Sequence, residues 1–214
     1  MKEIPLNRRT FLGTTSLAVI SQRLFAGTPA WAAPTAKVGT AAPAFTTDAT
    51  TGKHVSLGDY RGQLVVLEWT NHDCPYVRKH YDSGNMQALQ KEATGQGVVW
   101  LTLISSSPGT QGFVTPAQAD ELTMSRKASP TAVLLDPSGT VGKMYGATNT
   151  PHMYVIDKTG LLVYAGAIDD RPTTRRGDVQ GAQNYVRDAL QSVAAGQPVK
   201  TPVTRAYGCT VKYS

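Results

Sequence analysis

The sequence predicts an α/β fold: a central mixed sheet with helices on both faces, followed by an irregular C-terminal tail. Two observations carry this prediction. Stretches of strand length alternate along the chain with stretches that have helical start and stop signals, which is typical of parallel strands joined by helices. In addition, the continuous apolar run at 64–69 is typical of a strand that is buried on both faces of a sheet.

The first half of the chain supplies a short strand, a central strand and a divided helix. We expect the short strand at 54–57 and the central strand at 64–69. A helix begins at Pro75, because proline suits the first helical position. Ser and Gly at 83–84 interrupt this helix, and it resumes at 85–93.

The second half predicts further strands and helices. The expected strands are 98–105, 132–135, 153–156 and 161–165, and the expected helices are 116–127, 142–145 and 178–195. Thr115 and Gln118 have the spacing of a capping box in front of the first of these helices. The turn at 157–160 indicates an antiparallel hairpin at one edge of the sheet, while the strands before it are parallel.

The N-terminal segment 1–32 has the pattern of an export signal. Arg8 and Arg9 resemble the twin-arginine motif, and a modestly apolar run follows at 12–20. Small residues flank Trp31 as they do at a signal-peptidase site. We therefore expect a twin-arginine signal peptide and delivery to the bacterial periplasm, an oxidising compartment. An ordinary basic N-terminal helix is the alternative interpretation.

Charge and composition limit the partners of the remaining chain. Four basic residues and one acidic residue lie in 1–32, so half of the net charge of +6 belongs to that segment. The weak remaining charge, without a basic stripe, excludes a nucleic-acid-binding protein. After residue 35 no run of about 20 apolar residues occurs, so we expect no stable membrane insertion. The expected domains are 33–196, a single folded unit, and 197–214, a tail that carries Cys209.

The two cysteines, Cys74 and Cys209, are the strongest candidates for chemistry. Cys74 follows the central strand and directly precedes the helix that begins at Pro75. The dipole and free amide groups of a helix N-terminus favour a thiolate, and the end of a buried strand lies where ligands bind. A buried structural cysteine is the alternative. No pair of Cys or His residues has zinc spacing, so we expect neither a metal nor a cofactor.

Four separated segments occur in a characteristic order: 38–45, 52–62, Thr150-Pro151 and 157–160. In this order they resemble the peroxiredoxin-like redoxins of the alkyl hydroperoxide reductase and thiol-specific antioxidant superfamily, over about residues 38–195. The resemblance implies a thioredoxin-like fold. It also implies that Pro151 is a cis-proline beside the reactive sulfur, in the loop that binds the substrate chain.

Three positions differ from the patterns of that superfamily. Val77 stands where a thioredoxin-type dithiol has its second cysteine, and Asn71 stands where a peroxiredoxin has Thr or Ser. Residues 151–152 stand where a peroxiredoxin has arginine. Peroxide reduction and disulfide exchange therefore both stay open, and Thr70, Asn71 and Arg171 are the candidates to replace the missing peroxide-binding groups.

The leading hypothesis is an exported thiol-dependent oxidoreductase. Cys74 is its attacking thiolate and Cys209 is its candidate resolving thiol, so the two would form a disulfide. The partners are a thioredoxin-like electron donor and a peroxide or protein disulfide substrate. The expected active-site loops contain Thr70, Asn71, His72, Pro75, Thr150, Pro151 and His152.

A binding module without redox turnover is the alternative from another class. His72, His80 and His152 would then surround Cys74 and bind copper, as in thioredoxin-fold copper chaperones, or the fold would hold a partner protein. Those chaperones usually use two nearby cysteines, and this chain has one in that region. If copper is not bound, we expect His72 and His152 to tune or hydrogen-bond the sulfur and His80 to lie on the surface of its helix. Arg78 and Lys79 add positive charge one turn after Cys74.

Overall fold

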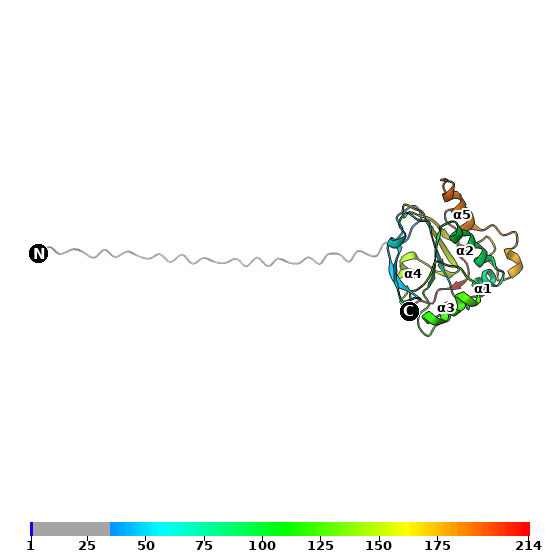
Figure 1. Cartoon of the computed structure of the whole chain (residues 1–214), viewed down its shortest axis with the longest axis horizontal. Helices are drawn as coiled ribbons and strands as arrows, with labels where there is room; N and C mark the ends of the chain where they lie inside the picture. Colours follow the sequence, from blue (N-terminus) through cyan, green and yellow to red (C-terminus); the bar gives the residue numbers. More distant parts are fainter. Residues whose placement is uncertain (2–34) are drawn as a thin grey trace. The chain divides into compact units, whose positions relative to one another are not determined.

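The computed structural model describes Met1 and residues 35–214 of the chain (Figure 1). The chain divides into two units, Met1–Ala32 and Ala33–Ser214, and the described helices and strands belong to the second. The predicted signal peptide, Met1 apart, lies outside the described residues.

Most of the described strands form one sheet. They are β1 (Thr46–Ala49), β2 (His54–Ser56), β3 (Val65–Trp69), β4 (Val99–Ile104), β5 (Ala132–Leu135), β7 (His152–Ile156) and β8 (Leu162–Gly166). Two short strands, β6 (Asn149–Thr150) and β9 (Cys209–Thr210), pair separately. The α-helices are α1 (Pro75–Asp82), α2 (Asn85–Gly95), α3 (Pro116–Ser125), α4 (Thr140–Tyr145) and α5 (Tyr185–Ala194).

The sheet is mixed, as the sequence predicts. Its seven strands have the order β2-β1-β5-β4-β3-β7-β8. The three central strands β3, β4 and β5 are parallel, and antiparallel pairs lie on both sides of them. Helices α1, α2 and α5 lie on one side of the sheet and α4 on the other (Figure 1).

Local signals explain where α1 and α3 begin and end. Pro75 is the first residue of α1, and Gly84 follows that helix with a φ of 76°, a left-handed value that favours glycine. At the start of α3, the Thr115 hydroxyl accepts a hydrogen bond from the backbone N–H of Gln118, and the Gln118 side chain accepts one from Thr115. The predicted break and the predicted capping box are both confirmed.

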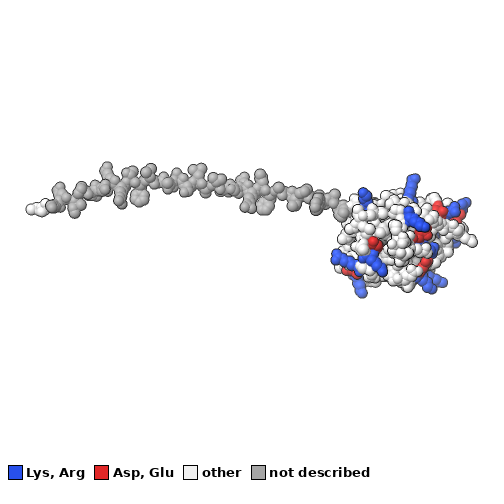
Figure 2. Space-filling model, turned by 90° about the horizontal axis from the view of Figure 1, so that it is seen from above, with Lys and Arg blue, Asp and Glu red and all other residues white. Residues whose placement is uncertain are grey.

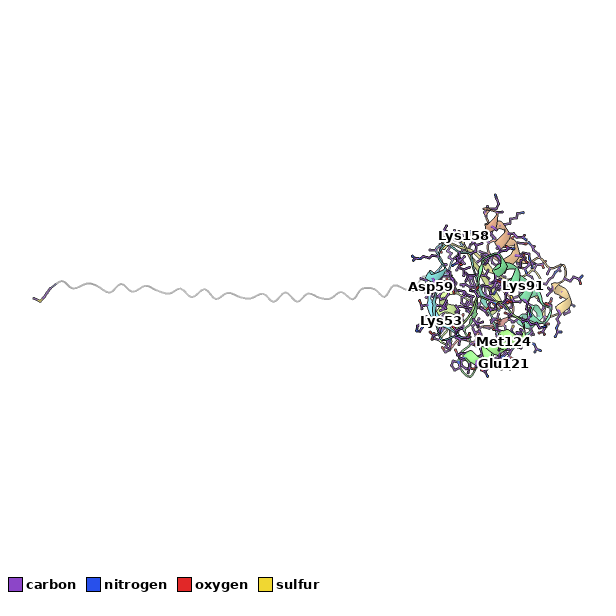
Figure 3. All side chains as sticks on the ribbon, in the orientation of Figure 1. Lys53, Asp59, Lys91, Glu121, Met124 and Lys158 are labelled. Atoms are coloured by element: carbon purple, nitrogen blue, oxygen red, sulfur yellow. The ribbon has the colours of Figure 1, made fainter. Side chains whose placement is uncertain are left out.

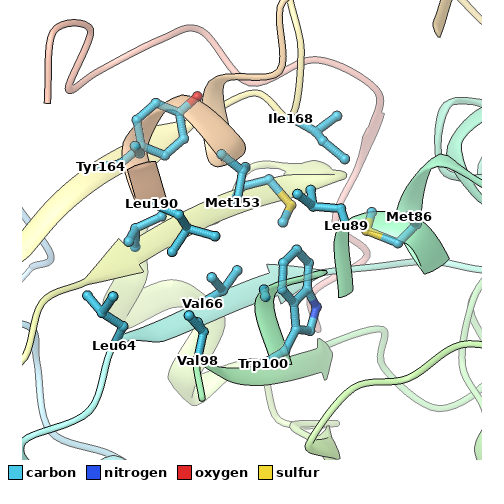
Figure 4. Close-up of a cluster of buried hydrophobic side chains, with 14 of the residues drawn as sticks. Leu64, Val66, Met86, Leu89, Val98, Trp100, Met153, Tyr164, Ile168 and Leu190 are labelled. Carbon is cyan, nitrogen blue, oxygen red and sulfur yellow. The ribbon is translucent and has the colours of Figure 1, made fainter. Parts of the chain in front are cut away.

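Alternation along β3 divides the core into two parts. Val66 faces α1, α2 and α5, whereas Leu67 and Trp69 face α4 and the N-terminal part of the domain. Figure 4 shows the first part, in which Val66, Trp100 and Met153 point toward one another. All five residues of β3 are buried, so the strand that leads to Cys74 is held from both sides.

Several elements differ from the sequence prediction. The last helix begins at Tyr185 rather than at residue 178, because Gly181 has a φ of 73° and the Asn184 side chain caps the helix at Arg187 N–H. Residues Arg176–Val179 form a separate 3-10 turn. Strand β1 has no counterpart in the prediction, and the tail contains β9 where no strand was expected.

Basic and acidic side chains are interspersed on the face of the molecule shown in Figure 2. A mixed surface of this kind agrees with the weak net charge that remains beyond residue 32. In the part of the chain that the structure describes, no helix has the length and apolar character needed to cross a membrane.

Candidate active site

Cys74 lies where β3 ends and α1 begins, as the residue that caps the helix. Its backbone N–H donates to the carbonyl of Asn71 at 3.1 Å, which closes the loop after β3. The side chain is 0% exposed. Its thiol donates to the carbonyl oxygen of Thr150 at 3.0 Å, and the backbone N–H of Cys209 lies 3.4 Å from the sulfur. The sulfur is therefore enclosed by two segments that are distant in sequence.

The first of these segments is the loop before β7. The peptide bond between Thr150 and Pro151 is cis, and the carbonyl of Thr150 faces the sulfur. The following residue, His152, begins β7 and stacks on the ring of Tyr154 with 4.6 Å between ring centroids. Burial lowers the pKa of His152 to about 4, so this imidazole is neutral near pH 7.

The second segment is the C-terminal tail. Its strand β9 pairs antiparallel with β6, so that Cys209 is opposite Thr150. Beside this pair, the Asn149 side-chain amide donates to the carbonyl of Gly208 at 2.8 Å. The backbone N–H of Val211 donates to the carbonyl of Thr148 at 3.0 Å. A Cβ atom at residue 208 would overlap the Thr150 carbonyl oxygen, so only glycine permits this close approach.

Both cysteines are free thiols in this structure. Burial, followed by the hydrogen bond and charge of Cys74, raises the pKa of Cys209 to about 11. Cys209 is therefore a neutral thiol near neutral pH. The 3.4 Å contact of its backbone N–H with the Cys74 sulfur makes the two residues neighbours. The structure thus brings together the two residues that the sequence analysis chose as candidates, although it does not link them.

A buried polar cluster joins the tail to α1. We call it the tail cluster, and it consists of Lys79, His80, Asp169 and Tyr207. The Lys79 ammonium lies 3.3 Å from Asp169 Oδ2 and donates to the Tyr207 hydroxyl at 3.2 Å. The Tyr207 hydroxyl in turn donates to Asp169. Lys79, His80 and Asp169 are each at most 2% exposed, so the cluster is shielded from water.

His80 completes the tail cluster as a neutral imidazole. Its Nε2 lies 3.0 Å from the Tyr207 hydroxyl, and its Nδ1 lies 2.8 Å from the Asn85 amide nitrogen. Burial, followed by the charge of Lys79, lowers the pKa of His80 to about 3. The expectation that His80 lies on the surface is therefore wrong, and Lys79 is buried against Asp169 instead of presenting a free charge. Tyr207 is two residues before Cys209, so this cluster fixes the tail close to the sulfur.

A second buried polar cluster lies deeper, behind α1. We call it the glutamate cluster. The Glu68 carboxylate accepts hydrogen bonds from Tyr81, Gln90, Trp100 and Thr102 at 2.8 to 3.1 Å. Burial raises the pKa of Glu68, and the four hydrogen bonds oppose that rise. All five residues belong to β3, β4, α1 and α2, so this cluster includes no part of the tail.

The remaining loop residues do not reach the sulfur through any contact that the structure shows. The Asn71 side chain accepts from Asp73 N–H at 2.9 Å and donates to the Gln111 carbonyl at 3.3 Å, so it supports the loop. His72 lies 3.4 Å from the Asp73 carboxylate. Arg171 pairs with Asp170 at 3.4 Å. The contacts that the structure shows for the Asn71 and Arg171 side chains are therefore made away from the sulfur.

The three histidines proposed for copper have separate environments. His72 is beside Asp73, His80 is inside the tail cluster, and His152 stacks on Tyr154. Within residues 35–214, the structure shows no group of three or more Cys, His, Asp or Glu side chains suited to hold a metal ion.

Sequence reasoning missed Glu68, Asp169 and Tyr207. Glu68 had a visible signal, because it is an acidic residue inside an otherwise apolar strand, where an unpaired charge is unfavourable. Asp169 and Tyr207 have no such local signal. Their importance depends on the tertiary contact between the tail and α1, which spans 128 residues between Lys79 and Tyr207.

Comparison with known proteins agrees with this geometry. The AhpC/TSA family model matches residues 38–165, which is more than half of the chain. The chain belongs to the AhpC/TSA family. Its members are redoxins with a thioredoxin-like fold, and the fold predicted from the sequence is confirmed. No curated protein sequence matches the chain.

Solved structures with a similar fold come from several bacteria. An uncharacterised conserved protein from Geobacillus kaustophilus is 24% identical with a TM-score of 0.72, and the match covers 83% of this chain and 93% of that one. A hypothetical protein from Sinorhizobium meliloti 1021 is 23% identical with a TM-score of 0.72, covering 84% and 96%. A putative thiol:disulfide interchange protein DsbE from Chlorobium tepidum is 22% identical with a TM-score of 0.49, covering 60% and 84%.

Proposed function

We propose that this redoxin is a thiol–disulfide oxidoreductase that uses Cys74 and Cys209 as one redox pair. One observation carries the proposal: the backbone of Cys209 donates to the sulfur of Cys74, while β9 pairs Cys209 with Thr150 beside the same sulfur. A reactive thiol at a helix N-terminus with a second thiol next to it is suited to form and break one disulfide.

The proposed cycle begins when the Cys74 thiolate attacks one sulfur of a substrate disulfide. The disulfide bond of the substrate breaks, its other sulfur leaves as a thiolate, and Cys74 is joined to the substrate in a mixed disulfide. The Cys209 thiol then loses its proton and attacks Cys74. This step releases the second substrate thiol and leaves a Cys74–Cys209 disulfide. An external dithiol donor, such as a thioredoxin-like protein, reduces that bond and is itself oxidised.

A disulfide is favoured over a peroxide as the substrate because of what surrounds the sulfur. The contacts that the structure shows for the Cys74 sulfur are the Thr150 carbonyl and one backbone N–H, without a cationic side chain. Cleavage of a peroxide produces a hydroxide or alkoxide that requires electrostatic stabilisation. A thiolate is a better leaving group, and it needs less help from the protein.

The tail must move for a substrate to react, since the Cys74 side chain is 0% exposed with the tail in place. We propose that opening of the segment around Cys209 admits the substrate, and that its return brings Cys209 back to Cys74. The tail then has two functions: it covers Cys74, and it supplies Cys209 to attack the mixed disulfide. Both depend on the same contacts at β6 and at the tail cluster.

The choice of substrate is tested with reduced protein, a peptide disulfide and an organic hydroperoxide in separate reactions followed by mass spectrometry. With the peptide disulfide, Cys209→Ser should accumulate a mixed disulfide at Cys74, and the unmodified chain should proceed to the internal disulfide. Cys74→Ser is the matched control and should stay unmodified. Rapid sulfenate formation with hydroperoxide, without any reaction with the peptide disulfide, would contradict the proposal.

We also propose that residues 1–32 direct export to the periplasm, where a stable disulfide can form. The Arg8-Arg9 pair and the small residues around Trp31 support this proposal. Replacing both arginines by lysine should leave the precursor uncleaved in the cytoplasm, as measured by fractionation and N-terminal sequencing. Normal cleavage near residue 33 in cells that lack twin-arginine transport would exclude this route.

A further inference from the structure

A groove lies along one side of the tail, next to the covered sulfur. We call it the tail groove, and its volume of about 570 Å³ is within the range of sites that hold small ligands. One wall is the tail at 204–208, and the other is the segment after β8 together with the start of α5. The groove is present while the tail covers Cys74, so a ligand can enter it before the tail opens.

One end of the groove adjoins the residues around the sulfur. Gly208 lines this end and directly precedes Cys209, whose backbone N–H lies 3.4 Å from the Cys74 sulfur. Tyr76 and Asn149 lie beside Gly208 and also line the groove. A peptide that lies in the groove therefore has one end next to the proposed redox pair.

The tail wall of the groove has backbone groups without partners. At its start, the backbone N–H of Thr204 donates to the carbonyl of Ala165 in β8, and beyond it β9 pairs with β6. Between these two paired stretches lie residues 205–207. For their backbone N–H and carbonyl groups, the described part of the chain supplies no hydrogen-bond partner. An extended peptide can pair with such groups in the way that a strand is added to the edge of a sheet.

Arg205 gives the groove a positive charge that no acidic side chain neutralises. Its side chain is exposed, and the structure shows no ion pair for it in the part of the chain that is described. The two acidic residues of the lining are already paired. Asp169 lies 3.3 Å from the Lys79 ammonium, and Asp170 lies 3.4 Å from Arg171 Nε. The free guanidinium therefore favours a carboxylate, whose geometry and charge match its own.

Aromatic rings supply much of the remaining surface of the groove. The ring centroids of Tyr76 and Tyr207 are 5.8 Å apart, and Tyr185 at the start of α5 lines the groove as well. Rings of this kind offer a large contact area to a ligand side chain, while their hydroxyls tolerate water. The groove thus suits a peptide that has an aromatic side chain beside an acidic one.

We propose that the tail groove binds an extended peptide that carries an acidic side chain. The peptide backbone pairs with residues 205–207, its carboxylate binds Arg205, and a neighbouring aromatic side chain packs on Tyr76 and Tyr185. This proposal rests on the proposed function in one respect: the bound peptide is the arm of the substrate whose disulfide reacts with Cys74. Binding itself needs no redox step.

The binding test uses the full chain with Cys74→Ser, so that no disulfide can form at that position. The probe is a peptide without cysteine, acetyl-Thr-Tyr-Glu-Val-amide, and backbone amide signals are followed by NMR during its titration. The signals of residues 205–207 should shift in a saturable way. The same peptide with lysine in place of glutamate should bind at least about fivefold more weakly, because it lacks the attraction to Arg205.

The charge of Arg205 is tested with two substitutions. Arg205→Gln should weaken binding of the acidic peptide about threefold, as expected for an exposed ion pair. The matched control is Lys158→Gln, which removes a cation at the outer surface in Figure 3, in the turn between β7 and β8 and outside the groove. It should change the affinity less than about twofold, because salt screens a distant exposed charge. With a disulfide form of the acidic peptide and both cysteines present, Arg205→Gln should raise KM and leave kcat unchanged.

Three results would overturn the proposal. Equal binding of the lysine peptide would show that Arg205 does not select the ligand. Equal binding of acetyl-glutamate amide, a single residue, would show an anion site without strand pairing. The third result is the absence of saturable shifts up to about 10 mM peptide, at which even a millimolar affinity would be nearly saturated. The proposed function fails in a different way: the acidic peptide would bind as predicted, but no peptide disulfide would react with Cys74.

Discussion

The tail cluster and the glutamate cluster are both buried and polar, but they connect different parts of the chain. In the glutamate cluster, all four donors to Glu68 come from strands and helices of the central domain. In the tail cluster, Tyr207 reaches from the C-terminal tail to Lys79 and Asp169. The same kind of interaction therefore stabilises the interior of the central domain in one place and joins the C-terminal tail to that domain in the other.

This difference assigns different roles to similar hydrogen bonds. Loss of a bond to Glu68 weakens the fold as a whole, because every partner belongs to an element of the core. Loss of the Tyr207 bonds weakens the attachment of the tail, because the partners of Tyr207 stay together as an ion pair without it. The exposure of Cys74 should therefore respond to changes in the tail cluster alone.

The largest effect is expected from Tyr207→Phe, which removes one hydroxyl from the tail cluster. This hydroxyl donates to the Asp169 carboxylate, and such bonds contribute about 1.5–3 kcal/mol. Losing this bond should lower the free energy needed to open the tail away from Cys74 by the same amount. Alkylation of Cys74 by iodoacetamide should then become at least about tenfold faster. Alkylation rates are measured in a Cys209→Ser background, so that Cys74 is the thiol being followed.

Tyr81→Phe is the matched control, since it removes the hydroxyl that donates to Glu68 at 2.8 Å. It should lower the unfolding free energy by a similar amount, about 1.5–3 kcal/mol, and change the alkylation rate less than about twofold. Equal acceleration of alkylation in the two variants would show that general loosening exposes Cys74, and the distinction between the clusters would then be wrong.

The dependence of stability on pH is expected to have opposite signs in the two clusters. His80 has a pKa of about 3 in the folded chain and about 6.5 when unfolded, so the unfolded chain binds the extra proton between these values. Its contribution to stability is complete above pH 6.5 and is lost as the pH falls, by up to about 1.4 kcal/mol per pH unit. The pKa of Glu68 is raised by burial, so its protonation favours the folded state as the pH falls toward 4.5.

Urea denaturation between pH 7 and pH 4 measures both contributions. His80→Gln should flatten the loss of stability toward low pH, whereas Glu68→Gln should steepen it. His152, whose pKa is also lowered by burial, contributes equally to both variants and to the unmodified chain. Identical pH profiles for the two variants would contradict the assignment of a neutral His80 and a proton-binding Glu68.

The sequence predicted the part of the site that depends on local signals. The apolar run of β3, the proline at position 75 and the glycine at position 84 are sufficient to place Cys74 between a buried strand and a helix N-terminus. The capping box at Thr115 likewise marks the start of α3. These features are encoded within a few residues of where they act, so they are visible without the tertiary structure.

The contacts between distant segments were less predictable. Lysine and histidine usually lie on helix surfaces, and only the approach of Asp169 and Tyr207 makes burial of Lys79 and His80 favourable. The last helix was predicted too long for a different, local reason. Its apparent start at residue 178 has helix-compatible residues, but the positive φ of Gly181 and the cap at Asn184 start it later.

The central claim is that the tail brings Cys209 to Cys74 as a redox partner. Its most direct test is peptide mapping by mass spectrometry after oxidation of the full chain with oxidised glutathione, without reductant and with free thiols blocked. We predict one linked pair of peptides, containing Cys74 and Cys209, that is lost on mild reduction. Two separately glutathionylated or blocked cysteines, with no linked pair at any oxidant concentration, would contradict the account.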